Sequence, residues 1–117
     1  VGFAFAGVEP EVMGVGPVPS TEKALARTGL SIADIDLFEV NEAFAVVPEK
    51  YIRDLDIDRE KINVNGGAIA LGHPIGATGS LLIGTVLDEL ERRDLNVGLV
   101  TMCAAGGMAP AVVIERI

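Results

Sequence analysis

Three polar residues, Asn41, His73 and Cys103, stand where expected strands give way to loops or helices. Side chains that follow strands gather at one edge of an open α/β sheet, where ligands bind. An imidazole can accept a proton from a thiol or hydroxyl, or hydrogen-bond a developing oxyanion. A thiol beside that ring can act as a base or a nucleophile, since an imidazole lowers the thiol pKa. An asparagine amide can orient a water or donate to an oxyanion.

The most distinctive stretch, residues 65–79, reads NGGAIALGHPIGATG and contains the only histidine of the chain. Its glycines allow backbone to pass where a Cβ would not fit. Pro74 suits the first turn of a helix, because its missing N–H costs nothing there. His73 is therefore expected at the positive end of a helix, which disfavours the imidazolium and leaves a neutral ring.

Each of these residues also has a purely structural interpretation. Asn41 is a good helix N-cap, His73 could serve the loop alone, and Cys103 could simply fill space at a strand end. The glycines of residues 72–79 do not form GxGxxG and no P-loop lysine follows, which argues against a nucleotide site. One histidine and one cysteine do not supply the three or four protein ligands of zinc, so no metal site is predicted.

The composition indicates one domain of 117 residues with an aliphatic core, because 50% of the residues are hydrophobic and only 4% are aromatic. The net charge of −8 argues against nucleic acid or an anionic membrane as a direct partner. A single cysteine excludes an internal disulfide and favours a reducing compartment, which we expect to be the cytoplasm. No apolar run reaches the roughly 18 residues of a membrane span.

The chain begins at Val1, inside an apolar run, so we expect a piece of a longer protein whose targeting signal could be missing. A mitochondrial or peroxisomal location therefore stays open.

Hydrophobic patterning predicts an α/β fold with a mixed five-stranded sheet and helices packed on its faces. Strands are expected at residues 1–8, 36–40, 62–64, 96–103 and 111–117, and helices at residues 20–28, 41–55 and 74–93. The first half of the last helix is apolar on nearly every side, and such a helix is buried all round. One small domain cannot enclose it, so we expect it to pack against a second body.

Four motifs then resemble the thiolase family, in order and at thiolase spacing: VMGVGPVP at residues 12–19, NEAFA at 41–45, NVNGGAIALGHPIGATG at 63–79 and MCAAGGM at 102–108. The resemblance covers nearly the whole chain and implies that residues 1–117 form a thiolase C-terminal domain. Thiolases stack two similar α/β halves into a five-layer sandwich with a shared helical centre. The acyl-carrying nucleophilic cysteine belongs to the N-terminal half, so this chain alone is expected to be inactive.

The resemblance also implies residue roles. His73 would activate the nucleophile of the other half and donate to the first oxyanion hole, which a water held by Asn41 completes. Cys103 would move the proton at Cα of acetyl-CoA, and the Ala105 N–H would help form the second oxyanion hole. Four further residues match positions near the acyl or pantetheine pocket: Met13, Ala43, Phe44 and Ala104.

The activity implied by the resemblance is that of an acyltransferase: CoA-dependent cleavage of 3-ketoacyl-CoA in fatty acid β-oxidation, or the reverse Claisen condensation. Coenzyme A would be a co-substrate, with no bound cofactor. Implied partners are acyl-CoA, the N-terminal half, further copies in a homodimer or homotetramer, and a hydratase/dehydrogenase subunit. Two alternatives remain: a non-catalytic acyl-CoA or lipid-binding protein, and a condensing enzyme, against which Cys103 argues.

Overall fold

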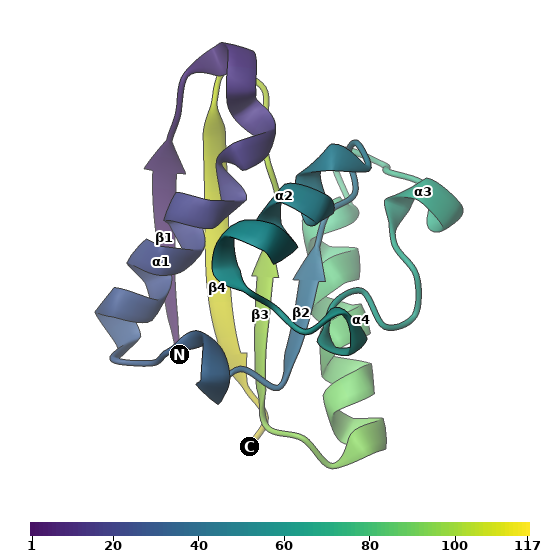
Figure 1. Cartoon of the computed structure of the whole chain (residues 1–117). Helices are drawn as coiled ribbons and strands as arrows, with labels where there is room; N and C mark the ends of the chain where they lie inside the picture. The colour runs from purple at the N-terminus through teal and green to yellow at the C-terminus, as the bar shows by residue number, and fades with distance from the viewer.

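The structure, a computed structural model, describes all residues from 1 to 117 and contains one mixed sheet flanked by helices (Figure 1). The strands lie in the order β1-β4-β3-β2, with β2 and β3 parallel and the other pairs antiparallel. Their bounds are β1 Gly2–Gly7, β2 Leu37–Val40, β3 Val97–Thr101 and β4 Met108–Glu115. The α-helices are α1 Pro17–Thr28, α2 Val46–Leu55, α3 Ala68–Leu71 and α4 Thr78–Arg93.

Three short 3-10 helices complete the chain: η1 Pro10–Val15, η2 Ile32–Asp34 and η3 Arg59–Lys61. Ser31 and Asp34 form a capping box, in which the Ser31 N–H donates to Asp34 at 2.8 Å. Gly29 ends α1 in the left-handed conformation, with φ +74°. Contrary to expectation, α1 begins at Pro17 and most of the preceding loop is η1, since prolines tolerate the first turn of a helix.

The sheet has four strands, so the prediction of a fifth strand at residues 62–64 is wrong. Ile62 makes only an isolated bridge to Phe38. The next residue, Asn63, leaves the extended conformation with φ +47°. Its side chain takes over the role of a strand backbone by accepting from the Val40 N–H at 2.8 Å and donating to the Val40 carbonyl at 2.9 Å.

The helix expected from Asn41 begins five residues later, at Val46, with Ala45 as its N-cap. The Asn41 N–H instead continues the β2 ladder by donating to the Thr101 carbonyl at 3.0 Å. Pro48 falls in the first turn of α2, where a missing N–H leaves no intrahelical bond broken. Pro48 therefore fits the helix as it stands, and Asn41 is not a helix cap.

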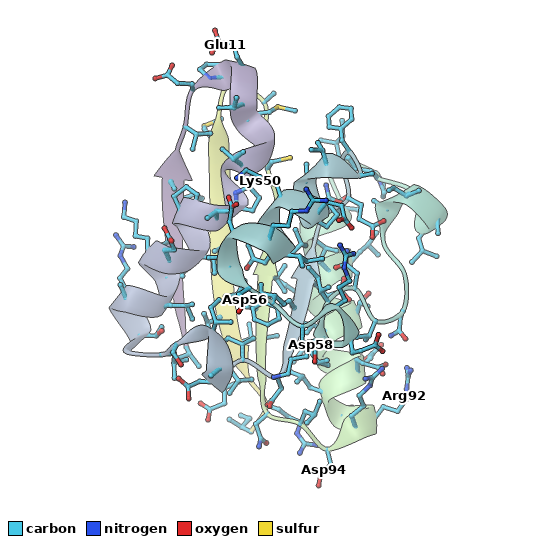
Figure 2. All side chains as sticks on the ribbon, viewed as in Figure 1. Glu11, Lys50, Asp56, Asp58, Arg92 and Asp94 are labelled. Carbon is cyan, nitrogen blue, oxygen red and sulfur yellow. The ribbon has the colours of Figure 1, made fainter.

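Two apolar clusters cover the two faces of the sheet. The larger one packs α1 and α2 on the face that carries Phe38 and Leu99, and Tyr51 lies at its centre with no exposed surface. The smaller one packs α4 on Leu37 and Val100 of the opposite face. Charged side chains such as Glu11, Asp58 and Arg92 project outward from this framework (Figure 2). No helix is long and apolar enough to cross a membrane.

The α4 face of the sheet is covered only in part, because α4 packs mainly on β2 and β3 at one side of the sheet. Phe3 and Phe5 of β1 are 60% and 61% exposed and pack edge to face with each other at 6.0 Å. On α4 itself, Leu81 is 53% exposed. The helix expected to be buried all round thus buries one face and leaves an apolar face open in this chain.

Candidate active site

His73 lies on the segment between α3 and α4 and is fixed by the first residue of α4. Gly72 ends α3 with φ +95°, a conformation that L side chains rarely adopt. The Nδ1 atom of His73 lies 2.7 Å from the hydroxyl oxygen of Thr78, which donates its own proton to the Pro74 carbonyl at 3.0 Å. Because that hydroxyl proton is engaged, Nδ1 must carry the ring proton. The Nε2 atom is then the basic nitrogen of a neutral ring.

Asn41 follows β2 directly and brings its side chain to this basic nitrogen. Its Nδ2 atom lies 3.3 Å from His73 Nε2. Asn41 has no exposed surface, and its side-chain oxygen is the one buried side-chain oxygen or nitrogen without a partner. The amide of Asn41 therefore donates to His73 on one side and offers an unused acceptor on the other.

Cys103 follows β3 and shares a mostly apolar hollow of about 330 Å³ with His73. The hollow is lined by residues from four segments: Met13, Ala43, Phe44, His73, Ile75, Met102, Cys103, Ala104 and Ala105. The thiol is only 5% exposed, and burial raises its pKa above the usual 9.0. The expectation that the nearby imidazole lowers the thiol pKa is wrong, because the loss of solvation prevails. The structure thus favours the protonated thiol.

A tight turn carries the backbone past Cys103. The Ala104 N–H donates to the Met108 carbonyl at 2.7 Å, and the Met108 N–H returns a bond to Ala104 at 3.2 Å. Gly106 and Gly107 between them have φ +86° and +83°. The Ala105 N–H has no backbone or side-chain acceptor and is available at the edge of the hollow. Ala105 itself is not among the residues with positive φ, so its Cβ fits this turn.

A second hollow of about 390 Å³ adjoins the first, and both share Met13 and Phe44. Apolar residues of η1 and α2 line it, with Lys50 and Glu11 as its charged members. Phe44 is 58% exposed, so its ring borders both hollows. The two hollows together provide an apolar surface that leads away from Cys103.

Two residues whose importance the sequence did not reveal hold the glycine-rich segment against β2. The Glu42 carboxylate accepts from the Asn63 side chain at 3.0 Å and from the Ile69 N–H at 3.1 Å. A Cβ on Gly67 would lie 2.2 Å from the Glu42 carboxyl carbon, so glycine is required for this approach. Both lie in the motifs NEAFA and NVNGG, but neither has a residue type that signals such a clamp. Thr78, which orients His73, was missed for the same reason.

These groups combine a proton acceptor, a buried thiol, a free backbone N–H and an apolar approach. That set is suited to chemistry at a carbon next to a carbonyl, where a proton moves and an oxygen gains charge. No three or more histidine, cysteine or acidic side chains cluster as metal ligands would. The site thus places the groups that carbon-acid chemistry needs at one edge of an α/β sheet.

Comparisons with known proteins identify the family of this domain. The family model described as "Thiolase, C-terminal domain" matches residues 1–116. The 3-ketoacyl-CoA thiolase of Bacillus subtilis is 56% identical over 97% of this chain and 29% of its own length. The acetyl-CoA acetyltransferase of Escherichia coli is 54% identical over 98% of this chain and 29% of its own length.

Solved structures agree. The Bacillus anthracis acetyl-CoA acetyltransferase matches with a TM-score of 0.98 and 45% identity, over all of this chain and 30% of that one. Human mitochondrial 3-ketoacyl-CoA thiolase in complex with CoA matches with a TM-score of 0.97 and 47% identity, again over all of this chain and 30% of that one. The chain belongs to the thiolase family and spans about a third of the length of the relatives it matches.

Proposed function

We propose that this chain is the acid/base half of an enzyme that cleaves 3-ketoacyl-CoA with coenzyme A, or forms it in reverse. The observation that carries the proposal is the shared hollow of His73 and Cys103, with the Ala105 N–H at its edge. Relatives over 50% identical to this chain are named as enzymes of this kind. The CoA complex of a 47% identical structure supports coenzyme A as co-substrate.

In the first half-reaction, the nucleophilic thiol belongs to a segment outside this chain, whose only cysteine is Cys103. His73 Nε2 takes the proton of that thiol as its sulfur bonds to the ketone carbon of the substrate. The new Nε2–H then donates to the ketone oxygen, which has become an oxyanion, together with a water held by Asn41. The geometry suits this role, because Nδ1 is committed to Thr78 and Nε2 is the basic nitrogen. The 3.3 Å contact of the Asn41 amide with Nε2 is released when the thiol proton arrives.

The oxyanion then collapses to a thioester, and the carbon–carbon bond between the ketone carbon and Cα breaks. Its electron pair passes to acetyl-CoA as an enolate, whose oxygen accepts from the Ala105 N–H. The Cys103 thiol gives its proton to Cα. Coenzyme A then gives its proton to the Cys103 thiolate and attacks the acyl-enzyme. This step releases the shortened acyl-CoA and the nucleophilic thiolate, which takes back the proton held on His73 Nε2. A raised thiol pKa favours the first proton transfer, since the acid must be protonated before cleavage.

The partner that completes the site is proposed to be an N-terminal half of the same protein. Its docking surface is the open apolar face of α4 and β1, where Leu81, Phe3 and Phe5 are more than half exposed. Exposed apolar patches of this kind mark interaction surfaces. Acyl-CoA would enter between the halves, along the hollows that border Met13, Ala43, Phe44 and Ala104. Assembly into a homodimer or homotetramer, and with a hydratase/dehydrogenase subunit, is part of the proposal.

The test is thiolysis of acetoacetyl-CoA, measured as acetyl-CoA release, by the 117-residue chain alone and by the full-length protein. The chain alone should be inactive, and the full-length protein active. Replacing His73 with alanine in the full-length protein should lower turnover by about 10²–10³-fold. Turnover by the chain alone would overturn the division of labour. A full-length protein that binds acyl-CoA without turnover would instead favour a non-catalytic acyl-CoA-binding protein.

A further inference from the structure

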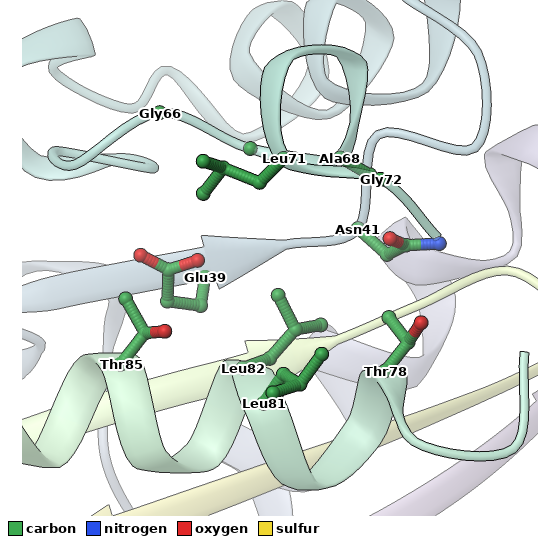
Figure 3. A pocket seen from close by; sticks show the side chains of 11 residues that line it. Glu39, Asn41, Gly66, Ala68, Leu71, Gly72, Thr78, Leu81, Leu82 and Thr85 are labelled. Carbon is green, nitrogen blue, oxygen red and sulfur yellow. The ribbon is translucent and has the colours of Figure 1, made fainter. Parts of the chain in front are cut away.

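A third cavity, of about 240 Å³, lies between β2, α4 and the glycine-rich segment, and Glu39 is the one charged residue that lines it (Figure 3). Glu39 is only 3% exposed. It lies on β2 two residues before Asn41, so both side chains leave the strand on the α4 side of the sheet. Asn41 and Thr78 line the same cavity, which therefore adjoins the residues that hold His73.

No cation neutralises Glu39, because none of the ion pairs of the chain includes it. The nearest charged groups are carboxylates, Glu42 on the β2 side and Glu89 on α4. Glu89 is itself paired with Arg92 at 2.6 Å and with Arg93 at 2.5 Å, so neither arginine forms an ion pair with Glu39. Burial, then the charges of Glu42 and Glu89, raise the pKa of Glu39 to about 8. At neutral pH the Glu39 carboxyl is therefore an O–H donor.

Asn41 presents the complementary acceptor, since its side-chain oxygen is buried in this region without a partner. The Cα atoms of residues two apart on a strand are roughly 7 Å from each other, so side chains that leave the strand in parallel do not reach one another by a direct hydrogen bond. The cavity is large enough for several waters, each of which occupies about 30 Å³ in the liquid. Figure 3 draws both residues among those that line the cavity, with Glu39 above Thr85 and Asn41 above Thr78.

We propose that Glu39 is a positioning residue that donates a hydrogen bond, through water in this cavity, to the side-chain oxygen of Asn41. This bond fixes which way the amide points, so that its nitrogen faces His73 Nε2 and its oxygen faces away. An inverted amide would set an oxygen lone pair against the lone pair of Nε2. Glu39, Asn41, His73 and Thr78 thus form one chain of hydrogen bonds that starts in the cavity and ends at the Pro74 carbonyl.

The direct test follows the nuclear magnetic resonance signals of the 117-residue protein as pH rises from about 6 to 10. The ¹³C signal of the Glu39 carboxyl should titrate near pH 8. The side-chain ¹⁵N and ¹H signals of Asn41 should move at the same midpoint, and this step should vanish in Glu39→Gln. His73 is the only histidine, so a step that belongs to its ring is recognised from its own signals. Asn41 signals that ignore the Glu39 titration would overturn the proposal.

The catalytic consequence rests on the proposed function and is tested in the full-length protein with two variants of similar size. Glu39→Gln keeps a neutral donor and should retain kcat and KM. Glu39→Met removes the donor and should lower kcat about three- to ten-fold, the value of one neutral hydrogen bond, with KM unchanged. Equal kcat in both variants, or equal loss in both, would contradict the positioning role. Failure of the proposed function would leave the resonance experiment intact, because that experiment needs no turnover.

Discussion

The Nε2 atom of His73 lies 3.3 Å from the side-chain nitrogen of Asn41, while Nδ1 of the same ring lies 2.7 Å from the Thr78 hydroxyl. The ring is therefore held from both sides by residues of two different elements. The Thr78 contact determines which nitrogen carries the proton, and the Asn41 contact determines what the basic nitrogen faces. This pair of contacts links the strand end of β2 to the start of α4.

Replacing Thr78 with valine keeps the shape of the side chain but removes the acceptor for the His73 Nδ1–H. In the full-length protein, kcat should fall about three- to ten-fold, and the ¹⁵N signals of the His73 ring should shift towards a mixture of tautomers. A matched control is Thr28→Val, because the Thr28 hydroxyl also bonds carbonyls of its own helix but lies outside the site. A Thr78 variant with an unchanged ring spectrum would refute the tautomer assignment.

The Cys103 thiol should react with iodoacetamide slowly at neutral pH, because burial raises its pKa above 9.0 and the thiolate is the reactive form. In the 117-residue chain it is the only cysteine, so the measured rate belongs to it alone. The rate should still be rising above pH 9, while the same chain unfolded in urea should level off earlier and react faster. A plateau below about pH 8 in the folded chain would show that the imidazole dominates after all.

Replacing Gly67 with alanine should destabilise the clamp that holds the glycine-rich segment. The added Cβ would lie 2.2 Å from the Glu42 carboxyl carbon, so the carboxylate would lose its bonds to Asn63 and Ile69. Overpacking of this kind typically costs about 1–3 kcal/mol of unfolding free energy, which urea denaturation can measure. The matched control is Gly76→Ala in the same segment, where a Cβ meets nothing within 4 Å. Equal stability of the two variants would disprove the clamp.

Glu39 should make the free energy of unfolding fall as pH rises. Its pKa is about 8 when folded and about 4.5 when unfolded, so between these values the unfolded chain releases a proton that the folded chain retains. The penalty grows by up to about 1.4 kcal/mol per pH unit and levels off above pH 8. Glu39→Gln should remove this pH-dependent penalty. In urea titrations, the free energy of unfolding of the variant relative to the wild type should therefore increase from about pH 5 to pH 8. A stability difference that is constant over this range would refute the raised pKa.

Much of the fold followed from patterns of period two and from turn residues. The mixed sheet and the positions of its strands were expected from apolar runs separated by glycines and charged connections, whereas the parallel pairing of β2 with β3 was not predicted. The strand at residues 62–64 could not be excluded from sequence, because the pattern does not reveal that Asn63 adopts φ +47°. Its side chain replaces strand pairing with two bonds to Val40, a tertiary contact that local propensity does not encode.

The candidate site also contains residues that the sequence predicted and residues that it did not. His73 and Cys103 were identified because few residue types carry their chemistry, and the structure places both in one hollow. Thr78 was missed because a threonine near a helix start is common, and only its position relative to the His73 ring gives it a role. The raised pKa of Cys103 depends on burial by residues distant in sequence, so its direction could not be read from the motif.

The central claim is that Cys103 moves the proton at Cα, whereas transfer of the acyl group depends on His73 and on a nucleophilic thiol outside this chain. The most direct measurement uses the full-length protein with Cys103 replaced by alanine, in two assays: thiolysis of acetoacetyl-CoA, and exchange of labelled coenzyme A into acetyl-CoA. Exchange needs only formation and breakdown of the acyl-enzyme. No proton moves at Cα, so Cys103 stays protonated, and the proton passes between the nucleophilic thiol and coenzyme A through His73. We predict that thiolysis falls by at least about 10²-fold, at the lower end of general acid–base contributions, while exchange persists. Thiolysis at the wild-type rate would contradict the account.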